Sequence, residues 1–150
     1  AYPTILQSVG AGPDPRDADL PGRSLVDIAN GKVPQRTILS EYHAAGALCG
    51  SYMIRHGQYK YIHYVGLPPM LFDLAADPNE RDDLGRNPQY AGVVRECEAA
   101  LRSVVDPEAA DRQAKADQQA KIAEVGGKDA ILQRGTFRYS PPPGAKATYY

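Results

Sequence analysis

Residues 51–84, SYMIRHGQYKYIHYVGLPPMLFDLAADPNERDDL, decide the fold of this chain. Two runs of β-forming residues, 52–55 and 58–65, flank the pair His56 and Gly57. Glycine adopts positive φ without strain, so a two-residue break of this kind between β-forming runs favours a tight hairpin turn. The sequence therefore predicts an antiparallel hairpin with His56 and Gly57 at its tip.

The predicted turn assigns each side chain of the hairpin to one of two faces. With the turn at this place, Ile54 pairs with Tyr59. Tyr52 pairs with Tyr61, and both pairs lie on one face because side chains alternate along a strand. We call the side that holds these four residues the tyrosine face, and we expect it to be the more buried. The other face collects Met53, Arg55, Gln58, Lys60, Ile62 and Tyr64.

Further strands are predicted on either side of the hairpin. Residues 70–74 form a third strand, and the turn DPNE at residues 77–80 closes it because proline fixes φ. Residues 37–42 alternate enough in polarity to form another strand upstream. The expected fold class is α+β: a small antiparallel sheet of three to four strands packed on a long amphipathic helix. A second, polar helix and an extended C-terminal tail are expected to follow.

The long amphipathic helix is predicted at residues 87–105. Asn87 is a good N-cap, and Pro88 suits the first helical position. Glu98 and Arg102 form a favourable i,i+4 pair on its polar side. A single apolar stripe recurs at the period of an α-helix and consists of Tyr90, Val93, Val94, Cys97, Leu101, Val104 and Val105. The stripe needs an apolar partner, and we expect that partner to be the tyrosine face.

The remaining segments predict a short N-terminal helix, a polar helix and a Pro-rich tail. Residues 2–9 predict a short helix that ends at Gly10. Residues 108–125 are rich in Ala and Gln and carry opposite charges at i,i+4 spacing, which supports a helix but not its burial. The tail, residues 136–150, is Pro-rich and carries Phe137 and three tyrosines. Aromatic side chains in such a tail favour docking on another surface, so we expect oligomer contacts here.

Composition argues against several classes of function. The 150 residues are 43% hydrophobic and carry a formal net charge of −1. This balance gives no electrostatic reason to expect a nucleic acid or an anionic membrane as a partner. No apolar run approaches the roughly 20 residues of a membrane span. The two cysteines, Cys49 and Cys97, are too few for a disulfide framework and lack the spacing of metal ligands.

Several motifs, in the same order, resemble the C-terminal region of sulfatases of the alkaline phosphatase superfamily. They are IRHGQYKYI at residues 54–62, LFDLAADPNE at 71–80, and DDL at 82–84, where Asp-Leu stands in place of the usual Asn-Leu. The segments SEYHAAG at 40–46 and FRYSPPPG at 137–144 are most similar to the choline-sulfatase and bacterial arylsulfatase branch. The resemblance extends over nearly the whole chain.

The resemblance implies that the chain is the C-terminal fragment of a sulfuric-ester hydrolase. Residues 1–35 would be a helix and loop from the end of the catalytic domain. Residues 36–106 would form the C-terminal subdomain, and residues 107–150 a helical arm and tail with oligomer contacts. The implied partners are the missing N-terminal catalytic domain, a further copy of the protein and a sulfate ester. Cytoplasm and periplasm of a bacterium are both compatible with this family.

The chemistry of the family is not visible in this sequence. Sulfatases use a formylglycine made from the Cys or Ser of a C/S-x-P-x-R motif, beside a divalent cation such as calcium. Neither this motif nor an Asp-Asn cluster of the family's type occurs here. We therefore expect no catalytic residue, no metal ligand and no cofactor in this chain, and no activity from it alone. The parent protein is expected to use both the formylglycine and the cation.

Substrate contact is predicted only at Glu41, Tyr42 and His43. A carboxylate beside an aromatic ring can hold a cationic head group by charge and by cation–π attraction. A histidine can hydrogen-bond a sulfate oxygen or transfer a proton. In choline-sulfatase-like proteins this segment approaches the mouth of the active site, so the resemblance implies a substrate-binding role in the parent. The competing interpretation is that Glu41 and His43 end a strand and pair locally.

Two other functions stay open at this point. The first is the C-terminal part of a phosphonate- or phosphate-ester hydrolase of the same superfamily. The second is a free-standing protein-interaction module that binds a partner through its tail. Such a module predicts a stable monomer, whereas a fragment predicts an exposed apolar surface near Ile5, Leu6 and Val9 and therefore self-association.

Overall fold

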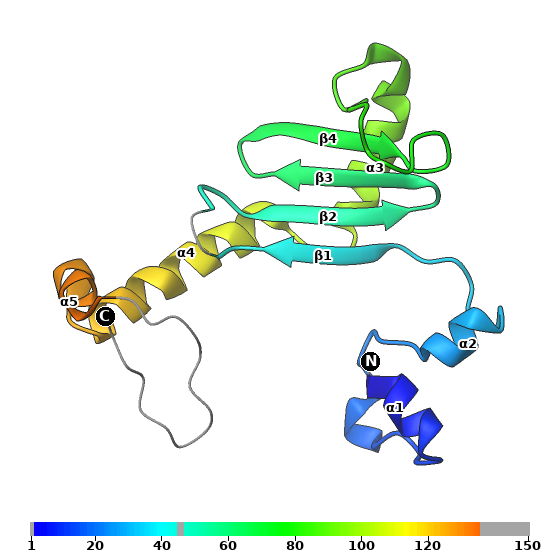
Figure 1. Cartoon of the computed structure of the whole chain (residues 1–150), viewed down its shortest axis with the longest axis horizontal. Helices are drawn as coiled ribbons and strands as arrows, with labels where there is room; N and C mark the ends of the chain where they lie inside the picture. Colours follow the sequence, from blue (N-terminus) through cyan, green and yellow to red (C-terminus); the bar gives the residue numbers. More distant parts are fainter. Residues whose placement is uncertain (1, 45–46, 136–150) are drawn as a thin grey trace. The chain divides into compact units, whose positions relative to one another are not determined.

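The computed structural model of the chain describes residues 2–44 and 47–135. The chain divides into two compact units, Ala1–Thr37 and Ile38–Tyr150. The first contains short helices and loops, and the second contains a four-stranded sheet with its helices (Figure 1). The predicted α+β class is confirmed, and the predicted tail lies outside the described residues. No described helix combines the length and the apolar character that crossing a membrane requires.

The first unit is held together by polar caps rather than by a core of buried apolar side chains. Its elements are α1 (Tyr2–Ser8), the 3-10 turn η1 (Pro15–Asp17) and α2 (Leu25–Ala29). Ser24 is the N-cap of α2, where its Oγ accepts the N–H of Val26 at 3.2 Å. The same hydroxyl donates to Gln7 of α1. Thr4 of α1 accepts the N–H of Leu25 at 3.0 Å, so the N-terminus of α2 is tied to α1 by two side chains.

The second unit is built on an antiparallel meander. Its strands are β1 (Ile38–Tyr42), β2 (Ser51–His56), β3 (Tyr59–Tyr64) and β4 (Leu67–Asp73). Each strand pairs with the next in the chain, in the spatial order β1-β2-β3-β4. The upstream strand predicted at residues 37–42 is therefore present and brings the sheet to four strands.

The hairpin turn lies one residue further along the chain than predicted. His56 is the last residue of β2, which leaves Gly57 and Gln58 as the two-residue loop. Gly57 has φ +58°, and glycine at the first loop position is the pattern of a type II′ turn. Ile54 consequently pairs with Tyr61, two residues beyond its predicted partner. The side chains within the two strands still lie on their predicted faces, because the alternation along a strand has a period of two, whereas Gln58 lies in the loop and not on the face predicted for it.

The core lies on the tyrosine face, as predicted. Tyr52 and Ile54 are completely buried, and Tyr61 is 1% exposed. Leu71 of β4, which pairs with Tyr61, is also completely buried. The adjacent β4 residue Phe72 points to the opposite face by alternation.

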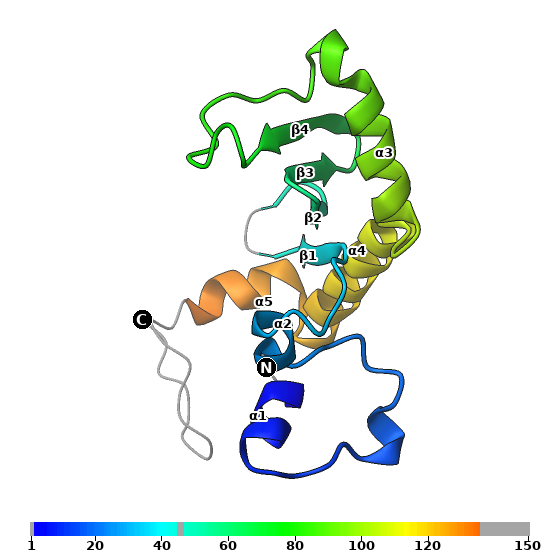
Figure 2. The same ribbon diagram turned by 90° about the vertical axis from the view of Figure 1, so that its right-hand side faces the viewer.

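The amphipathic helix covers the tyrosine face. The 3-10 turn η2 (Pro88–Tyr90) leads into α3 (Ala91–Arg102), and the Asn87 side chain caps this segment by accepting the N–H of Gln89 at 3.0 Å. Cys97 and Leu101 are buried against the sheet, while Val104 is 55% exposed. Figure 2 shows α3 running along one side of the four strands. Burial of one large apolar side chain contributes roughly 1.5–3 kcal/mol, so the stripe accounts for this packing.

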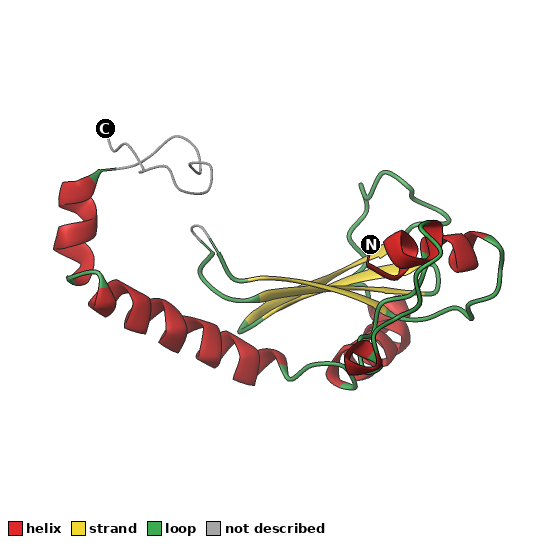
Figure 3. Cartoon of the chain, turned by 90° about the horizontal axis from the view of Figure 1, so that it is seen from below, coloured by secondary structure: helices red, strands yellow, loops and turns green. Residues whose placement is uncertain are grey.

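The second helix is docked at its start and exposed along the rest of its length. Helix α4 is Pro107–Glu124, and α5 is Gly127–Arg134. The hydroxyl of Tyr52 donates to the carbonyl oxygen of Pro107 at 2.9 Å. Asp111 is 5% exposed and accepts the N–H of Gly50 at 2.6 Å. In Figure 3, α3 and α4 lie on the same side of the sheet, and α4 runs on beyond its edge.

The segment after β4 folds back along the outer edge of that strand. The N–H of Leu84 donates to the carbonyl oxygen of Leu71 at 2.8 Å. The Asp83 carboxylate accepts the N–H of Leu71 at 3.0 Å and that of Gly85 at 2.9 Å. A Cβ added at Gly85 would lie 2.4 Å from the carbonyl oxygen of Pro69, so this approach of two backbones requires glycine. The DDL motif therefore covers the outer edge of β4, which is one of the two edges of the sheet.

Candidate functional site

The three predicted substrate-binding residues lie at the end of β1, but they do not share a face. Glu41 pairs with Tyr52 of β2, which places it on the tyrosine face beside the core. Tyr42 is the next residue, so its ring points to the opposite face, where it is 51% exposed. His43 follows directly after the strand. The structure therefore brings together Glu41 and His43, whose Oε2 and Nε2 atoms are 3.8 Å apart, and it separates Tyr42 from them.

His43 is held by contacts on several sides. Its ring meets the ring of Tyr52 edge-on, with centroids 5.4 Å apart. Its carbonyl oxygen accepts a hydrogen bond from Nε2 of Gln118 in α4 at 2.6 Å. A Cβ at Gly50 would lie only 3.0 Å from Cε1 of the imidazole. The imidazole therefore has a fixed orientation, with its Nε2 edge toward Glu41.

The other nitrogen of this imidazole faces a small cavity. Nδ1 of His43 is buried and makes no hydrogen bond within the part of the chain that the structure describes. It borders a cavity of about 10 Å³ that is also lined by Cys49, Gly50 and Asp111. A space of this size is near the minimum that holds one water molecule, and buried polar groups commonly bind such waters.

The electrostatics around this end of β1 are acidic. The pKa of Tyr52 is raised to about 12, first by burial and then by the charges of Glu41 and Asp111. Its hydroxyl thus stays protonated and donates to Pro107 at all physiological pH values. The side chain of Glu41 is 50% exposed, whereas that of His43 is 21% exposed. Glu41 is therefore the member of this pair that is accessible to a ligand.

A second polar cluster lies between β3, α3 and α4. The hydroxyl of Tyr61 donates to Glu98 of α3, and Nδ1 of His63 lies 3.2 Å from the same carboxylate. Arg102 donates to Glu98 at 2.6 Å and to both oxygens of Glu108 at 2.7 and 2.8 Å. Hydrogen bonds from Arg102 lower the pKa of Glu108 to about 2. Nε2 of His63 is buried and makes no hydrogen bond among the described residues, but Arg102 pairs with both carboxylates, which is the arrangement of a structural junction.

Sequence reasoning found only part of this cluster. The i,i+4 spacing predicted the pair of Glu98 and Arg102, which the structure confirms. The contacts from Tyr61 and His63 depend on strand register and on where α3 lies, so no local spacing reveals them. His63 is largely buried, with 12% of its side chain exposed.

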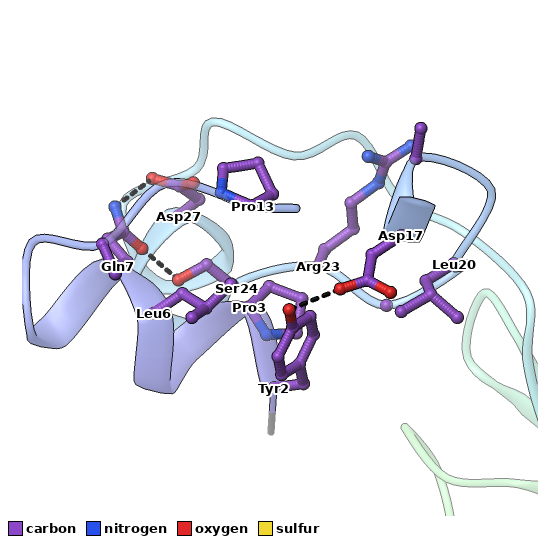
Figure 4. Close-up of a pocket in the computed structure, with 13 residues that line it drawn as sticks. Tyr2, Pro3, Leu6, Gln7, Pro13, Asp17, Leu20, Arg23, Ser24 and Asp27 are labelled. Atoms are coloured by element: carbon purple, nitrogen blue, oxygen red, sulfur yellow. Dashed lines mark hydrogen bonds between the residues drawn. The ribbon is translucent and has the colours of Figure 1, made fainter. Parts of the chain in front are cut away.

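The first unit contains a pocket of about 460 Å³ between α1 and the loop that leads to α2. Figure 4 shows hydrogen bonds that join three pairs of its polar side chains, one of them between Gln7 and Ser24. Tyr2 donates to Asp17, and Gln7 donates to Asp27 at 3.1 Å. The apolar part of the lining comes from Pro3, Leu6, Pro13 and Leu20.

The metal chemistry of sulfatases finds no support in the described residues. In residues 2–44 and 47–135, no three His, Cys, Asp or Glu side chains converge as metal ligands would. A hard divalent cation needs several oxygen ligands that converge on one point. Asp73, Asp77 and Asp83 instead accept backbone N–H groups in turns and along the edge of β4. These residues do not fit a divalent cation.

Comparison with known proteins gives partial matches. No family model matches the chain. It is 33% identical to arylsulfatase K of Danio rerio over 114 residues, which cover 70% of this chain and 21% of that protein. It is 37% identical to PehA of Trinickia caryophylli, a multifunctional protein of the alkaline phosphatase superfamily, over 63% of this chain and 21% of PehA. Choline-sulfatase of Rhizobium meliloti matches at 40% identity over 68 residues, 45% of this chain and 13% of that enzyme.

A solved structure extends the likeness to the fold. It is a protein of Bacteroides thetaiotaomicron classed provisionally as a sulfatase, with 27% identity and a TM-score of 0.60. The likeness covers 79% of this chain and 25% of that one. The chain spans about a fifth of the length of the arylsulfatase K proteins that it matches. It is thus a partial homologue of sulfatases of the alkaline phosphatase superfamily.

Proposed function

We propose that the chain is the C-terminal part of a sulfuric-ester hydrolase, in which it supports the catalytic domain and borders the substrate entrance. The observation that carries this proposal is the match to arylsulfatase K over 70% of the chain. The fold likeness at 27% identity supports it independently. The nucleophile and the cation are assigned to the part of the protein outside this chain, because the C/S-x-P-x-R motif does not occur in its sequence.

We assign the substrate contact to Glu41 and a positioning role to His43. Glu41 has an exposed carboxylate at the end of a rigid strand, and a charge there attracts a cationic head group. His43 lies 3.8 Å from that carboxylate in a fixed orientation, so it holds Glu41 in place. Tyr42 would contribute from the opposite face of β1, at the strand terminus, where its exposed ring can offer a cation–π contact.

The experiment compares two sulfate esters on the longer protein that contains this chain. Glu41→Gln removes the negative charge and keeps the shape of the side chain. We expect kcat/KM for choline-O-sulfate to fall about tenfold or more, since loss of a charge contact at a desolvated cation costs about 1.4 kcal/mol or more. The same variant should change kcat/KM for an uncharged aryl sulfate much less. His43→Gln should reproduce the effect in weaker form.

The matched control is Ser40→Ala. Ser40 is the preceding residue of β1 and points to the other face of the sheet from Glu41. Its kinetics should be those of the wild type for both esters. Equal losses for the two esters in Glu41→Gln would contradict a head-group contact, and unchanged kinetics in that variant would exclude any role at the substrate entrance.

A second candidate substrate class is a phosphonate or phosphate ester. The observation that favours it is the 37% identity to PehA, a multifunctional member of the superfamily. Assays of the longer protein on a sulfate monoester and a phosphonate monoester with the same leaving group separate the two candidates. A larger kcat/KM for the sulfate ester supports the first candidate, and the reverse order supports the second.

Subunit contacts through residues 107–150 remain a prediction. The described part of this segment supports it only by exposure: beyond its docked start, α4 presents a polar surface, and Leu132 of α5 is 67% exposed. Such a surface is available to a second copy of the protein.

A further inference from the structure

Helix α4 holds the connection between β1 and β2 at both of its ends. This connection begins at His43 and ends at Gly50, directly after the predicted substrate-binding residues. The carbonyl oxygen of His43 accepts a hydrogen bond from Gln118 at 2.6 Å, and the N–H of Gly50 donates to Asp111 at 2.6 Å. Asp111 and Gln118 are about two helical turns apart, so they lie on the same face of α4.

Asp111 differs from the other polar residues of α4 because its carboxylate is buried. The residue is 5% exposed. A buried charge is costly unless its oxygens are hydrogen-bonded. One oxygen of Asp111 accepts the N–H of Gly50, and the other accepts Nζ of Lys115 at 2.8 Å. The hydrogen bond from Lys115 is the main cause of the lowered pKa of Asp111, which is therefore ionised at neutral pH.

The same carboxylate lies close to the imidazole of His43. Asp111, Gly50 and His43 border one small cavity, and the buried Nδ1 of His43 faces it. The opposite ring atom, Nε2, lies 3.8 Å from Oε2 of Glu41. Glycine at position 50 leaves room for the ring, since a Cβ there would lie 3.0 Å from Cε1. The imidazole is thus placed between α4 and the carboxylate to which we assign the substrate contact.

We propose that Asp111 is a positioning residue of the substrate entrance. It holds Gly50, and Gln118 fixes the backbone at His43. Together these contacts fix the imidazole against which Glu41 rests, so the Glu41 carboxylate is presented in one place to a cationic head group. This inference rests on the proposed function, because Asp111 acts only through the contact assigned to Glu41. A carboxylate with a merely structural role would affect stability but not the choice between esters.

The first experiment measures an ester ratio in the longer protein, defined as kcat/KM for choline-O-sulfate divided by kcat/KM for an uncharged aryl sulfate. Asp111→Ala leaves the N–H of Gly50 without its acceptor. We expect the ester ratio to fall about threefold or more, because small displacements of a positioned group are costly. The fall should appear in KM rather than in kcat, since the head group is remote from the bond that breaks. Asp111→Asn keeps an acceptor oxygen and should restore most of the ratio.

A double variant separates positioning from a general loss of structure. In the Glu41→Gln background, the charge that Asp111 positions is already absent. Asp111→Ala should therefore change the ester ratio no further, because the two residues act as a unit. Additive falls in the two backgrounds would overturn the proposal, and so would an unchanged ratio in Asp111→Ala with wild-type Glu41.

The second experiment needs no turnover. Deuterium uptake of this chain, measured by mass spectrometry in a peptide of residues 47–52, reports on the N–H of Gly50. We expect this uptake to be about tenfold faster or more in Asp111→Ala, because exchange follows local opening. Asp111→Asn should remain near the wild type. Unchanged uptake in Asp111→Ala would overturn the proposal, since the hydrogen bond would then not hold Gly50.

The matched control is Asp117→Ala. Asp117 is an exposed residue of α4, and its carboxylate accepts a hydrogen bond from Gln113 of the same helix at 2.7 Å. This variant should leave both the uptake of residues 47–52 and the ester ratio unchanged. Equal changes in Asp117→Ala and Asp111→Ala would overturn the proposal, because any loss of charge on α4 would then suffice.

A variant at the other end of the connection serves if Asp111→Ala does not fold, which circular dichroism would show. Gln118→Ala removes the hydrogen bond to the carbonyl oxygen of His43 and changes an exposed residue. It should lower the ester ratio, and this fall should disappear in the Glu41→Gln background. An unchanged ratio in Gln118→Ala would overturn the proposal.

Failure of this proposal can be told from failure of the proposed function. If Glu41→Gln lowers the ester ratio and Asp111→Ala does not, the head-group contact stands and the positioning role is rejected. If Asp111→Ala speeds deuterium uptake but Glu41→Gln leaves the ratio unchanged, α4 holds the connection, and the substrate contact is rejected together with the positioning role.

Discussion

At the scale of single residues, the DDL motif shows what a short sequence signal does in three dimensions. Asp83 accepts the N–H groups of Leu71 and Gly85 with one carboxylate oxygen. An asparagine, the usual residue of the family here, has a carbonyl oxygen at the same place and can accept the same bonds. Asp-Leu in place of the usual Asn-Leu is therefore compatible with the contacts to Leu71 and Gly85.

Gly85 allows a direct test of this contact. Gly85→Ala would bring a Cβ to within 2.4 Å of the carbonyl oxygen of Pro69, which is backbone and cannot rotate away. We expect the free energy of unfolding in urea to fall by about 1–3 kcal/mol, the usual cost of forcing a methyl group into a filled space.

The matched control for this change is Gly92→Ala. Gly92 lies in α3, and a Cβ there would meet no atom within 4 Å. Replacing a helical glycine by alanine should raise stability by roughly 0.5–1 kcal/mol. A loss of stability in both variants would show that the contact with Pro69 is not the cause.

At the scale of elements, the predicted and observed hairpins differ in a way that the pleat explains. Glycine can occupy either position of a two-residue loop, and the sequence alone did not decide between His56-Gly57 and Gly57-Gln58. The hydrophobic pattern decides only which face a residue takes, and a shift of two residues preserves that pattern. The buried set of Tyr52, Ile54 and Tyr61 was predictable for this reason, while their pairing was not.

The contacts of the candidate site also fall into those that local sequence spacing predicts and those that it does not. Local spacing identified Glu41 and His43 as neighbours at a strand end and Glu98 with Arg102 as a helical pair. The contact of Gln118 with His43 joins residues 75 positions apart in the chain. Contacts of this kind follow from where α4 docks, so a single sequence does not encode them in any local pattern.

The junction between α3 and α4 gives a prediction on pH. Arg102 lowers the pKa of Glu108 from 4.5 to about 2. A carboxylate with a lowered pKa stabilises the fold fully above its unfolded pKa and loses that contribution as the pH falls through the folded value. Stability to urea should therefore decrease between about pH 4.5 and pH 2, and Glu108→Gln should make this decrease shallower.

The size of the effect is limited by exposure. The side chain of Glu108 is 39% exposed, so we expect Glu108→Gln to cost at most about 1 kcal/mol at pH 7. Glu124→Gln removes an equivalent charge from an ion pair on α4 whose side chains are 70% and 66% exposed, and should leave the pH dependence unchanged. A slope that is the same in Glu108→Gln and wild type would show that Arg102 and Glu108 do not couple in solution.

At the scale of the whole molecule, the first unit exposes apolar side chains that an independent domain would bury. Ile5, Val9 and Leu25 are 59%, 71% and 60% exposed. Leu6, by contrast, is half-buried against its own unit and lines the pocket of Figure 4. This surface favours a part of a larger protein over a free-standing interaction module.

Light scattering on the chain alone tests this distinction. We expect an apparent mass above that of a monomer, because several exposed apolar side chains on one small unit favour association. Ile5→Lys should lower the apparent mass. Leu48→Lys, which places the same charge on an exposed apolar position between β1 and β2, should not change it. A wild-type chain that remains monomeric at high concentration would favour the interaction module.

The strap formed by Asp83 and Leu84 has a consequence for how copies of this sheet could polymerise. Growth beyond β4 is blocked, since its outward groups at Leu71 are occupied and Pro69 has no N–H to offer. Only β1 remains as a template, with β2 as its one strand partner among residues 38–44 and 47–135. An assembly that grows by pairing sheets edge to edge needs two unpaired edge strands in each molecule. Two molecules could pair through their β1 strands, and neither would then have an unpaired edge. This route therefore excludes endless fibrils.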